Sequence, residues 1–456
     1  MLDEVLHTRP AGVDDAFALV DGLDDALVHG LARIDETRAA ALEALAAAFS
    51  GSPLGGRVTD SVGKIIAGTV TDEHLAALAG ARTALLGATH DALLTGLDDA
   101  LGRSRDPWSA VAVPALPGGL LAGGRSWLRE LAITGWRGVD HEVASGGAQT
   151  VQTLIADPST RRLAVLLDGF AAELRASAPV ATLDRVPVRR WADLWARAVL
   201  LAQEVSTAHD TSPVDGRLLP LGVDLHEHPT VFRAQLHGLL ETTDGRVRLV
   251  RTSVAGAKVD TISGPSAWRL LSAFPIFRTV VAEHRTVEVS GLALTPGGDL
   301  IWEESRAAAG EPADPFASAR VRLAAATAAP TPPLDRHPAV IAEPVLLEGY
   351  AAGEESFDLA GGGTLAVALD RLPAAGPLTP ALVAASTACL GLLRWDGGRW
   401  SVQPLAVQSV VKRKPVAVHT GDWALGPTEA KAAKAEAVAG TAVEVLRERA
   451  GRLLRK

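Results

Sequence analysis

The chain has little cysteine, tyrosine or methionine, and the shortage of cysteine limits what it can be. Cys389 is the only cysteine among 456 residues, so intrachain disulfides and cysteine-rich zinc or iron–sulfur sites are excluded. A chain of this length can bury several apolar cores and needs no such crosslink for stability. A single free thiol is typical of a reducing compartment, and we expect a cytoplasmic location.

Long apolar runs and a signal sequence are also missing. No uninterrupted stretch of about 18 apolar residues occurs, so we expect no membrane-spanning helix. The first residues, Met1 to His7, are acidic and lack the basic and apolar regions of a secretory signal. We therefore expect neither membrane insertion nor export.

Basic residues do not predominate either. Lys and Arg number 44 against 53 Asp and Glu, which gives a net charge of −9. A dedicated nucleic-acid-binding domain is normally basic, so this charge disfavours nucleic acid as the main partner. Abundant alanine, arginine and glycine beside scarce lysine are typical of a bacterial genome rich in G and C.

The first half of the sequence has the pattern of helices. Residues 13–48 and 71–101 carry apolar residues at helical spacing, and Thr71 is a suitable N-cap for the second stretch. Proline and glycine interrupt the pattern over residues 103–124. Helical spacing then resumes and continues to about residue 210.

Three large side chains lie on the apolar stripes of these helices. Arg82 falls on the buried stripe of residues 71–101, and we expect it to reach solvent along its aliphatic stem. Trp191 and Trp195 lie one helical turn apart. They could form a shelf for a ligand, but packing in the core is the favoured interpretation.

A six-residue sequence occurs twice in the helical half. Gly-Leu-Asp-Asp-Ala-Leu is found at residues 22–27 and again at residues 96–101. The paired acids could be a duplicated site for a metal or a partner. We favour two solvated helix faces in a region rich in alanine, leucine and aspartate.

After Asp210 the apolar spacing changes from helix-like to strand-like. Asp244-Gly245 is a strong signal for a two-residue hairpin turn. Such a turn would place Leu240 opposite Leu249 and Thr242 opposite Val247. One face of this hairpin would then be apolar and the other charged, as in a half-solvated antiparallel sheet.

A second hairpin is predicted around Gly397-Gly398, with Trp395 opposite Trp400. Gly-Leu-Leu precedes both hairpins, at residues 238–240 and 391–393. This shared sequence could mark two related β-units. We favour independent use of the same turn chemistry.

The predicted fold class is α+β and multidomain, because the helices and the strands are segregated along the chain. An α-helical N-terminal region is followed by antiparallel β-rich units and a C-terminal helix. Residues 306–337 consist largely of alanine, proline and charged residues, and the run 329–333 is the best candidate for a linker. The expected units are a helical domain at 1–105, a second helical domain or its continuation at 125–210, a β-rich unit at 215–305, a second one at 338–425, and a helix at 426–456.

The sharpest cluster of candidate ligands is Asp224-Leu225-His226-Glu227-His228. Alternate residues of a strand share one face, so Asp224, His226 and His228 could offer several metal ligands at once. If Pro229 and Thr230 make the following turn, His237 lies opposite Gly222 and not beside His228, which disfavours a site of three histidines. The alternative interpretation is a polar sheet face beside a turn.

Motifs of known enzyme classes are missing. There is no Gly-x-Ser-x-Gly elbow and no His-Glu-x-x-His, and residues 56–64 lack the spacing of a phosphate loop. Cys389 lies among apolar residues, which is typical of an inert buried thiol. These absences favour a protein without catalytic activity and leave an enzyme open.

The leading hypothesis is a non-catalytic cytoplasmic interaction or scaffold protein, such as an accessory subunit of a larger bacterial assembly. It predicts a protein partner and no cofactor, and leaves the oligomeric state open. The alternative is a metal-dependent enzyme or metal-binding module that holds a divalent metal on the Asp224, His226 and His228 strand. A third hypothesis is binding of nucleic acid or another polyanion through the basic C-terminal helix, helped by residues 412–414.

Overall fold

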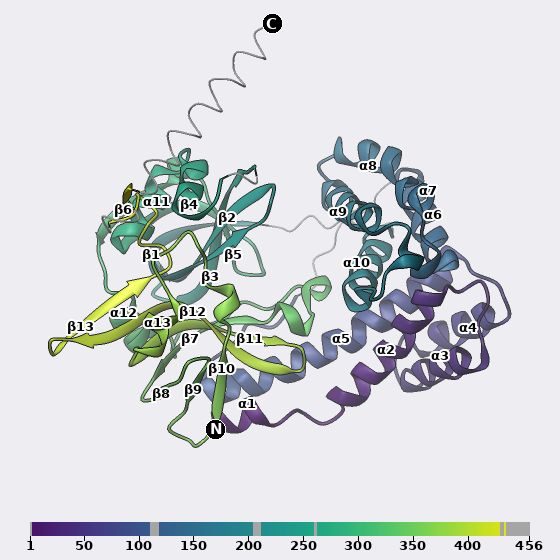
Figure 1. The fold of residues 1–456 in the computed structure, drawn as a ribbon, viewed down its shortest axis with the longest axis horizontal. Coiled ribbons are helices and arrows are strands. Elements are labelled where there is room, and N and C mark those ends of the chain that lie inside the picture. Colours follow the sequence, from purple (N-terminus) through teal and green to yellow (C-terminus); the bar gives the residue numbers. More distant parts are fainter. Residues whose placement is uncertain (1, 110–117, 204–210, 260–261, 429–432, 435–456) are drawn as a thin grey trace, which may run out of the picture.

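The computed structural model describes residues 2–109, 118–203, 211–259, 262–428 and 433–434 of the chain. Within these ranges ten α-helices come first, and two mixed sheets of six and seven strands follow with three more helices (Figure 1). The α+β, multidomain class is therefore confirmed. The predicted C-terminal helix falls almost entirely outside the described residues. No helix in the described ranges is both long and apolar enough to cross a bilayer.

Some helices of the N-terminal region begin at a capping side chain, which is Asp35, Thr71 or Asp140. Thr71 accepts a hydrogen bond from the backbone N–H of His74 (3.3 Å) and starts the long helix α5, as the sequence predicted. Gly102 ends α5 in the left-handed conformation, with φ 62°. The helices are α1 Leu2–His7, α2 Val13–His29, α3 Glu36–Ala48, α4 Gly55–Ile66, α5 Asp72–Leu101, α6 Gly118–Thr134, α7 His141–Ser145, α8 Ala148–Ile155, α9 Arg161–Ser177 and α10 Val188–Leu201.

Helix α4 was not predicted. Its glycines disfavour a helix, because glycine loses the most backbone freedom on folding. However, Val58, Val62 and Ile65 recur at helical spacing and are all buried. Packing of this stripe therefore outweighs the low intrinsic helix propensity.

Aromatic rings form the centre of the helical region. Trp136 meets Phe170, Trp191 and Trp195 edge to face, with ring centroids 5.8, 6.4 and 6.5 Å apart. The stripe with Trp191 and Trp195 is thus core, as predicted. Buried residues from 1–105 and from 125–210 belong to one apolar cluster, so the two stretches share a single core.

The first sheet closes into a barrel. Its strands are β1 Ser212–Glu227, β2 Val231–Thr242, β3 Val247–Ala257, β4 Arg285–Leu294, β5 Asp299–Ile301 and β6 Ala307–Pro312. β1 pairs with both β2 and β4, and β3 runs parallel to β5, so the ring β1-β2-β3-β5-β4 is complete. The helix α11 Pro275–Glu283 lies between β3 and β4. This connectivity is that of an OB fold, a five-stranded Greek-key barrel.

The β2–β3 hairpin forms, but its predicted register is wrong by one residue. Leu239, and not Leu240, lies opposite Leu249. The backbone N–H of Thr242 donates to the carbonyl of Arg246 (2.9 Å), which leaves a three-residue loop. A two-residue turn would force both Asp244 and Gly245 into the left-handed region. The longer loop needs a positive φ at Gly245 alone, and this is what the structure has.

The second sheet has the same connectivity. Its strands are β7 Ala342–Glu348, β8 Ala351–Ala352, β9 Ser356–Asp358, β10 Thr364–Val367, β11 Ala388–Asp396, β12 Arg399–Val411 and β13 Lys414–His419. β7 pairs with β11, β8 pairs with β9, and β10 runs parallel to β12. Since only Gly349 and Tyr350 separate β7 from β8, the two act as one broken strand that closes a second barrel. α13 Pro380–Ala384 precedes β11.

The second hairpin matches its prediction. Trp395 lies opposite Trp400, their ring centroids are 5.3 Å apart, and both rings are buried. Gly397 and Gly398 both have a positive φ, as a two-residue turn requires. The two hairpins are not equivalent, however, because the first joins the second and third strands of its barrel and the second joins the fourth and fifth. Their shared Gly-Leu-Leu therefore does not mark equivalent strands of the two barrels.

Backbone pairing joins the helical region to the first barrel. The N–H of Ala328 donates to the carbonyl of Ser104 (2.8 Å), and the N–H of Asp106 donates to the carbonyl of Ala328 (3.0 Å). The next residue of the same segment pairs with the barrel, because the N–H of Thr327 donates to the carbonyl of Val247 (2.9 Å). The predicted linker range 306–337 therefore also contains paired backbone, together with β6 and the helix α12 Pro315–Arg322.

In both copies of the repeated hexapeptide the first acid is buried in an ion pair with an arginine. Asp24 and Asp98, the first acids of each pair, are buried, whereas Asp25 and Asp99 are exposed. Asp98 accepts hydrogen bonds from Arg105 at 2.6 and 3.0 Å. The interpretation as two solvated faces was therefore wrong for half of the acids, because each buried carboxylate meets an arginine from another segment.

Candidate functional site

An open cleft lies between the helical region and the second barrel. Residues from α2, α10, the 3₁₀ turn η6 (Pro338–Val340) and the β11–β12 turn line it, and its volume is about 450 Å³. We call it the interlobe cleft. Its size lies within the range typical of ligand-binding pockets.

A buried ion pair lies beside the cleft. Arg82 of α5 donates to both carboxylate oxygens of Asp24 of α2, at 2.7 and 3.0 Å, and each side chain is only 1% exposed. The expectation that Arg82 reaches solvent was therefore wrong. A fully buried guanidinium needs a well-placed carboxylate partner, and no local pattern indicated that Asp24, 58 residues away, would supply it.

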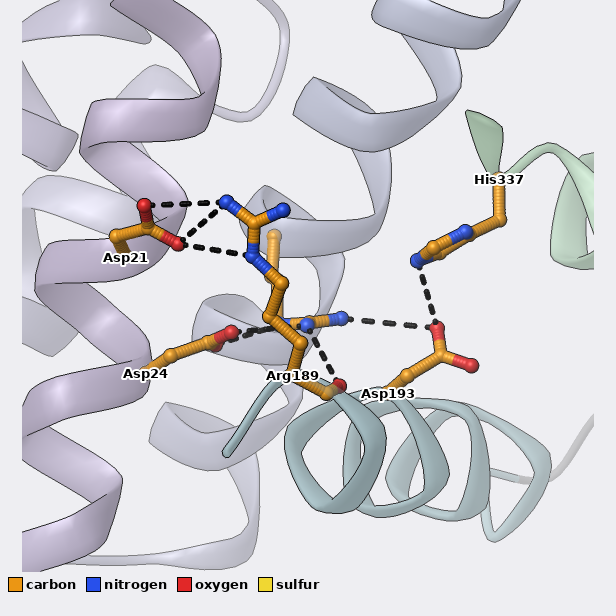
Figure 2. Close-up of polar contacts among 6 residues, drawn as sticks. Asp21, Asp24, Arg189, Asp193 and His337 are labelled. Atoms are coloured by element: carbon orange, nitrogen blue, oxygen red, sulfur yellow. Dashed lines mark hydrogen bonds and ion pairs between the residues drawn. The ribbon is translucent and has the colours of Figure 1, made fainter. Parts of the chain in front are cut away.

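Asp193 of α10 is the point where three basic groups meet. Its carboxylate lies 3.7 Å from Arg82, 3.0 Å from Arg197 and 3.5 Å from His337. Figure 2 shows His337, which precedes η6, pointing across the cleft toward Asp193. Asp193 thus ties the helical region to the segment that joins the two barrels.

His337 has both ring nitrogens engaged. Nδ1 accepts a hydrogen bond from the backbone N–H of Ala339 (3.2 Å), and Nε2 faces Asp193. Burial lowers the pKa of His337 to about 4, although Asp193 opposes the shift. The ring is therefore neutral at pH 7 with its proton on Nε2, which leaves no free lone pair for general-base catalysis.

Exposed arginines form the rim. Arg189 is paired with Asp21 at 3.1 Å, as Figure 2 shows, and its guanidinium stacks 5.1 Å from the ring centroid of Phe17. Arg190 is paired with Glu173 (2.9 Å). More than half of each arginine side chain is exposed. Such pairs are weak in water, so both guanidinium groups can exchange their partners for a ligand.

The predicted metal-ligand strand places Asp224 between the two barrels. Its carboxylate accepts hydrogen bonds from Arg394 of β11 and Gln403 of β12, both at 2.8 Å, and lies 3.0 Å from His226. Burial alone would raise the pKa of Asp224, but His226, Arg394 and Gln403 together hold it well below its usual range. The structure therefore brings Asp224 and His226 together on β1, and the bonds of Asp224 to Arg394 and Gln403 join the two barrels.

His228 lies apart from this pair, in the turn, where its Nδ1 bonds to the hydroxyl of Thr230 (2.9 Å). Across the described part of the chain, no group of three or more His, Cys, Asp or Glu side chains is arranged to hold a metal ion. The metal site stays a prediction. Metal analysis of the purified protein, with His226→Ala/His228→Ala as the control, tests it; equal metal in both proteins contradicts it.

His237 lies opposite Gly222, as the turn at Pro229 and Thr230 predicted. It is buried against a small cavity of about 60 Å³ that Arg105 and Arg251 also line. Burial lowers the pKa of His237 to about 4, and its Nε2 has no hydrogen-bond partner within the described residues.

The interlobe cleft was not found from the sequence. Its residues come from four segments, near positions 17, 190, 337 and 396, and no segment carries a motif. The only local signal was the pair Arg189-Arg190 at the start of a helix. Of the predicted basic elements, Lys412 and Arg413 form the β12–β13 turn, and the C-terminal helix lies outside the described residues.

No protein-family model matches the chain, and no curated protein is significantly similar to it.

Proposed function

We propose that the protein is a non-catalytic interaction protein, and that the interlobe cleft holds an acidic segment of a protein partner. The observation that carries this proposal is the gathering of Arg189, Arg190 and Arg197 of α10 along one open cleft. Arginine presents a rigid fork of donors that matches a carboxylate, and its weak hydration favours use at interfaces. This role suits an accessory component of a larger assembly.

The chemistry of the nearby titratable groups supports binding over catalysis. His337 has no free lone pair, and Asp193 is surrounded by three cationic or polar partners. Cys389 is buried in the second barrel, and burial raises the pKa of its thiol, which removes the thiolate needed for nucleophilic attack.

A protein partner is favoured over single-stranded nucleic acid. Proteins that bind single strands offer exposed aromatic rings on which bases stack. Here Trp395 is buried and lies beneath Arg9, while Arg189 covers Phe17. The net charge of −9 also opposes the approach of a long polyanion, whereas a short acidic segment meets only the local arginines.

Fluorescence anisotropy with a labelled hexaglutamate peptide tests the proposal, with hexaglutamine as the neutral peptide. At low ionic strength the wild-type protein should bind hexaglutamate and not hexaglutamine. Arg189→Gln/Arg190→Gln should weaken binding roughly tenfold, which corresponds to about 1.4 kcal/mol.

The matched control is Arg33→Gln/Arg57→Gln, which removes the same charge from exposed arginines outside the cleft. This variant should bind hexaglutamate like the wild type. Failure of the wild type to bind, or equal weakening by both double variants, contradicts the proposal.

A further inference from the structure

A second hollow continues the interlobe cleft along the second barrel. It has a volume of about 410 Å³ and lies between β10, the 3₁₀ turn η7 (Leu369–Arg371) and the β11–β12 turn. Ala339, Trp395, Asp396 and Gly397 line both hollows, so the two lie next to each other. Because Arg371, Arg394 and Arg399 all line it, we call it the arginine recess.

Strand pairing explains why charged groups gather there. Arg394 lies opposite Ser401, and Asp396 lies opposite Arg399. Residues directly opposite each other share a face, and alternate residues of a strand point the same way. These four side chains therefore occupy one face of the hairpin, while the Trp395 and Trp400 pair fills the other.

The guanidinium groups of the recess are incompletely neutralised. Arg394 is only 12% exposed and shares its partner, Asp224, with His226 and Gln403. Arg371 has only a loose contact of 3.8 Å with Asp396.

Arg399 is exposed and makes no side-chain hydrogen bond or ion pair with any other described residue.

Burial lowers the pKa of Arg394, and repulsion from Arg371 adds to this effect. An added anion would relieve that repulsion.

We propose that the arginine recess binds a carboxylate side chain of the acidic partner segment, which replaces Asp396 beside Arg371 and Arg399. The inference rests on the proposed function and names the anchoring point within it. Asp396 is two-thirds exposed, so it can turn into solvent when the incoming carboxylate arrives. A carboxylate fits because its two oxygens accept from paired N–H groups of one guanidinium.

Two variants test the replacement with the same hexaglutamate peptide. Arg371→Gln/Arg399→Gln should weaken binding roughly tenfold, a loss of about 1.4 kcal/mol. Asp396→Asn should strengthen binding roughly threefold, because the internal competitor loses its charge. A purely structural role for the recess would not produce this gain. Urea unfolding of each variant confirms that the fold is retained.

The outcomes separate this inference from the proposed function. If Arg189→Gln/Arg190→Gln weakens binding and Arg371→Gln/Arg399→Gln does not, the cleft is supported and the recess is rejected. No gain in the Asp396→Asn variant also rejects the recess. Absence of binding by the wild type rejects both proposals.

Two competitors check the chemistry of the ligand. Displacement of the peptide by acetate at concentrations similar to those of inorganic phosphate supports a carboxylate site. Displacement by phosphate alone overturns it in favour of a phosphoryl group, and tighter binding of an oligothymidine overturns it in favour of nucleic acid.

Discussion

The two barrels share one connectivity but differ in what covers equivalent surfaces. In the first barrel, the segment 328–331 and Glu343 lie over β3 and the β4–β5 turn, and only about 60 Å³ remains around His237. In the second barrel, the equivalent surface beside β10 and the β11–β12 turn opens into the arginine recess of about 410 Å³. The same fold thus forms a closed joint in one place and a free surface in another, so the fold alone does not identify a binding site.

Among single substitutions, the largest effect is expected from breaking the closed joint of the first barrel. Arg105 contacts Asp98 (2.6 Å) and Glu343 (3.1 Å), and it also donates to the carbonyl of Ala329 (2.8 Å). Arg105→Met would leave two largely buried carboxylates without this partner, at a cost of about 3–5 kcal/mol of unfolding free energy. The midpoint of urea unfolding measures the loss.

An exposed pair in the same barrel is the control. Arg246 and Asp244 form an ion pair in the β2–β3 turn, where both side chains are well exposed. Arg246→Met should leave the midpoint of urea unfolding nearly unchanged, because water screens this pair. Similar losses of unfolding free energy in the two variants would show that the ion pairs of Arg105 contribute no more than an exposed pair does.

The second prediction concerns acid, and its sign follows from the buried histidines. His237, His337 and His419 each have a folded-state pKa of about 4, below the ordinary value of 6.5, because burial disfavours the charged ring. Between pH 6.5 and 4 the unfolded chain therefore binds more protons than the folded one. Stability should be complete above pH 6.5 and fall toward pH 4, by up to about 3 kcal/mol for each histidine.

Urea midpoints at several pH values across this window measure the effect. His237→Leu removes the titrating group of the first barrel and should make the decline shallower. A midpoint that stays constant from pH 7 to pH 4 would contradict the prediction.

Two glycines in the first barrel give a smaller but sharper comparison. Gly298 and Gly245 both have a φ of 84°, so alanine strains the backbone at either site. A Cβ at Gly298 would come within 2.7 Å of the Cβ of Ala329 in the covering segment, whereas a Cβ at Gly245 meets nothing within 4 Å.

Gly298→Ala should therefore destabilise the protein by about 1–3 kcal/mol more than Gly245→Ala, because the added methyl group overpacks the joint. Thermal unfolding of the two variants measures the difference. Equal losses of stability would mean that the segment at Ala329 moves aside without cost to accept the added methyl group.

The smallest effect is expected at the rim of the open cleft. Arg189→Gln breaks the exposed contact with Asp21 and should cost between 0 and about 1 kcal/mol of stability. Urea unfolding checks this value beside the peptide-binding assay. A larger loss would show that the rim supports the fold, which would weaken its assignment as a free surface.

Local rules explain which parts of the fold were predictable. The N-cap at Thr71, the turn at Gly397-Gly398 and the buried Trp395–Trp400 pair each depend on residues close together in sequence. The shifted β2–β3 register was not predictable from spacing, because Asp244 bonds to Thr242 and Arg246 and so favours a three-residue loop.

The candidate site could not be predicted because its parts meet only after folding. Arg82 and Asp24 come from two helices, and Asp193 and His337 come from segments 144 residues apart in the numbering. Arginines at Arg371 and Arg399 look like ordinary surface charge until β10 and β12 pair. Tertiary contact, and not local propensity, creates both the cleft and the recess.

The strand-like contact between Arg105 and the segment at Ala328 and Ala329 also has a consequence for synthesis of the chain. The two partners are separated by 224 residues. At about 5–20 residues per second, the ribosome needs roughly 10–45 s to make that stretch. During this interval the backbone around Ser104 and Asp106 has no partner strand, and chaperones have time to bind there before residue 328 is made.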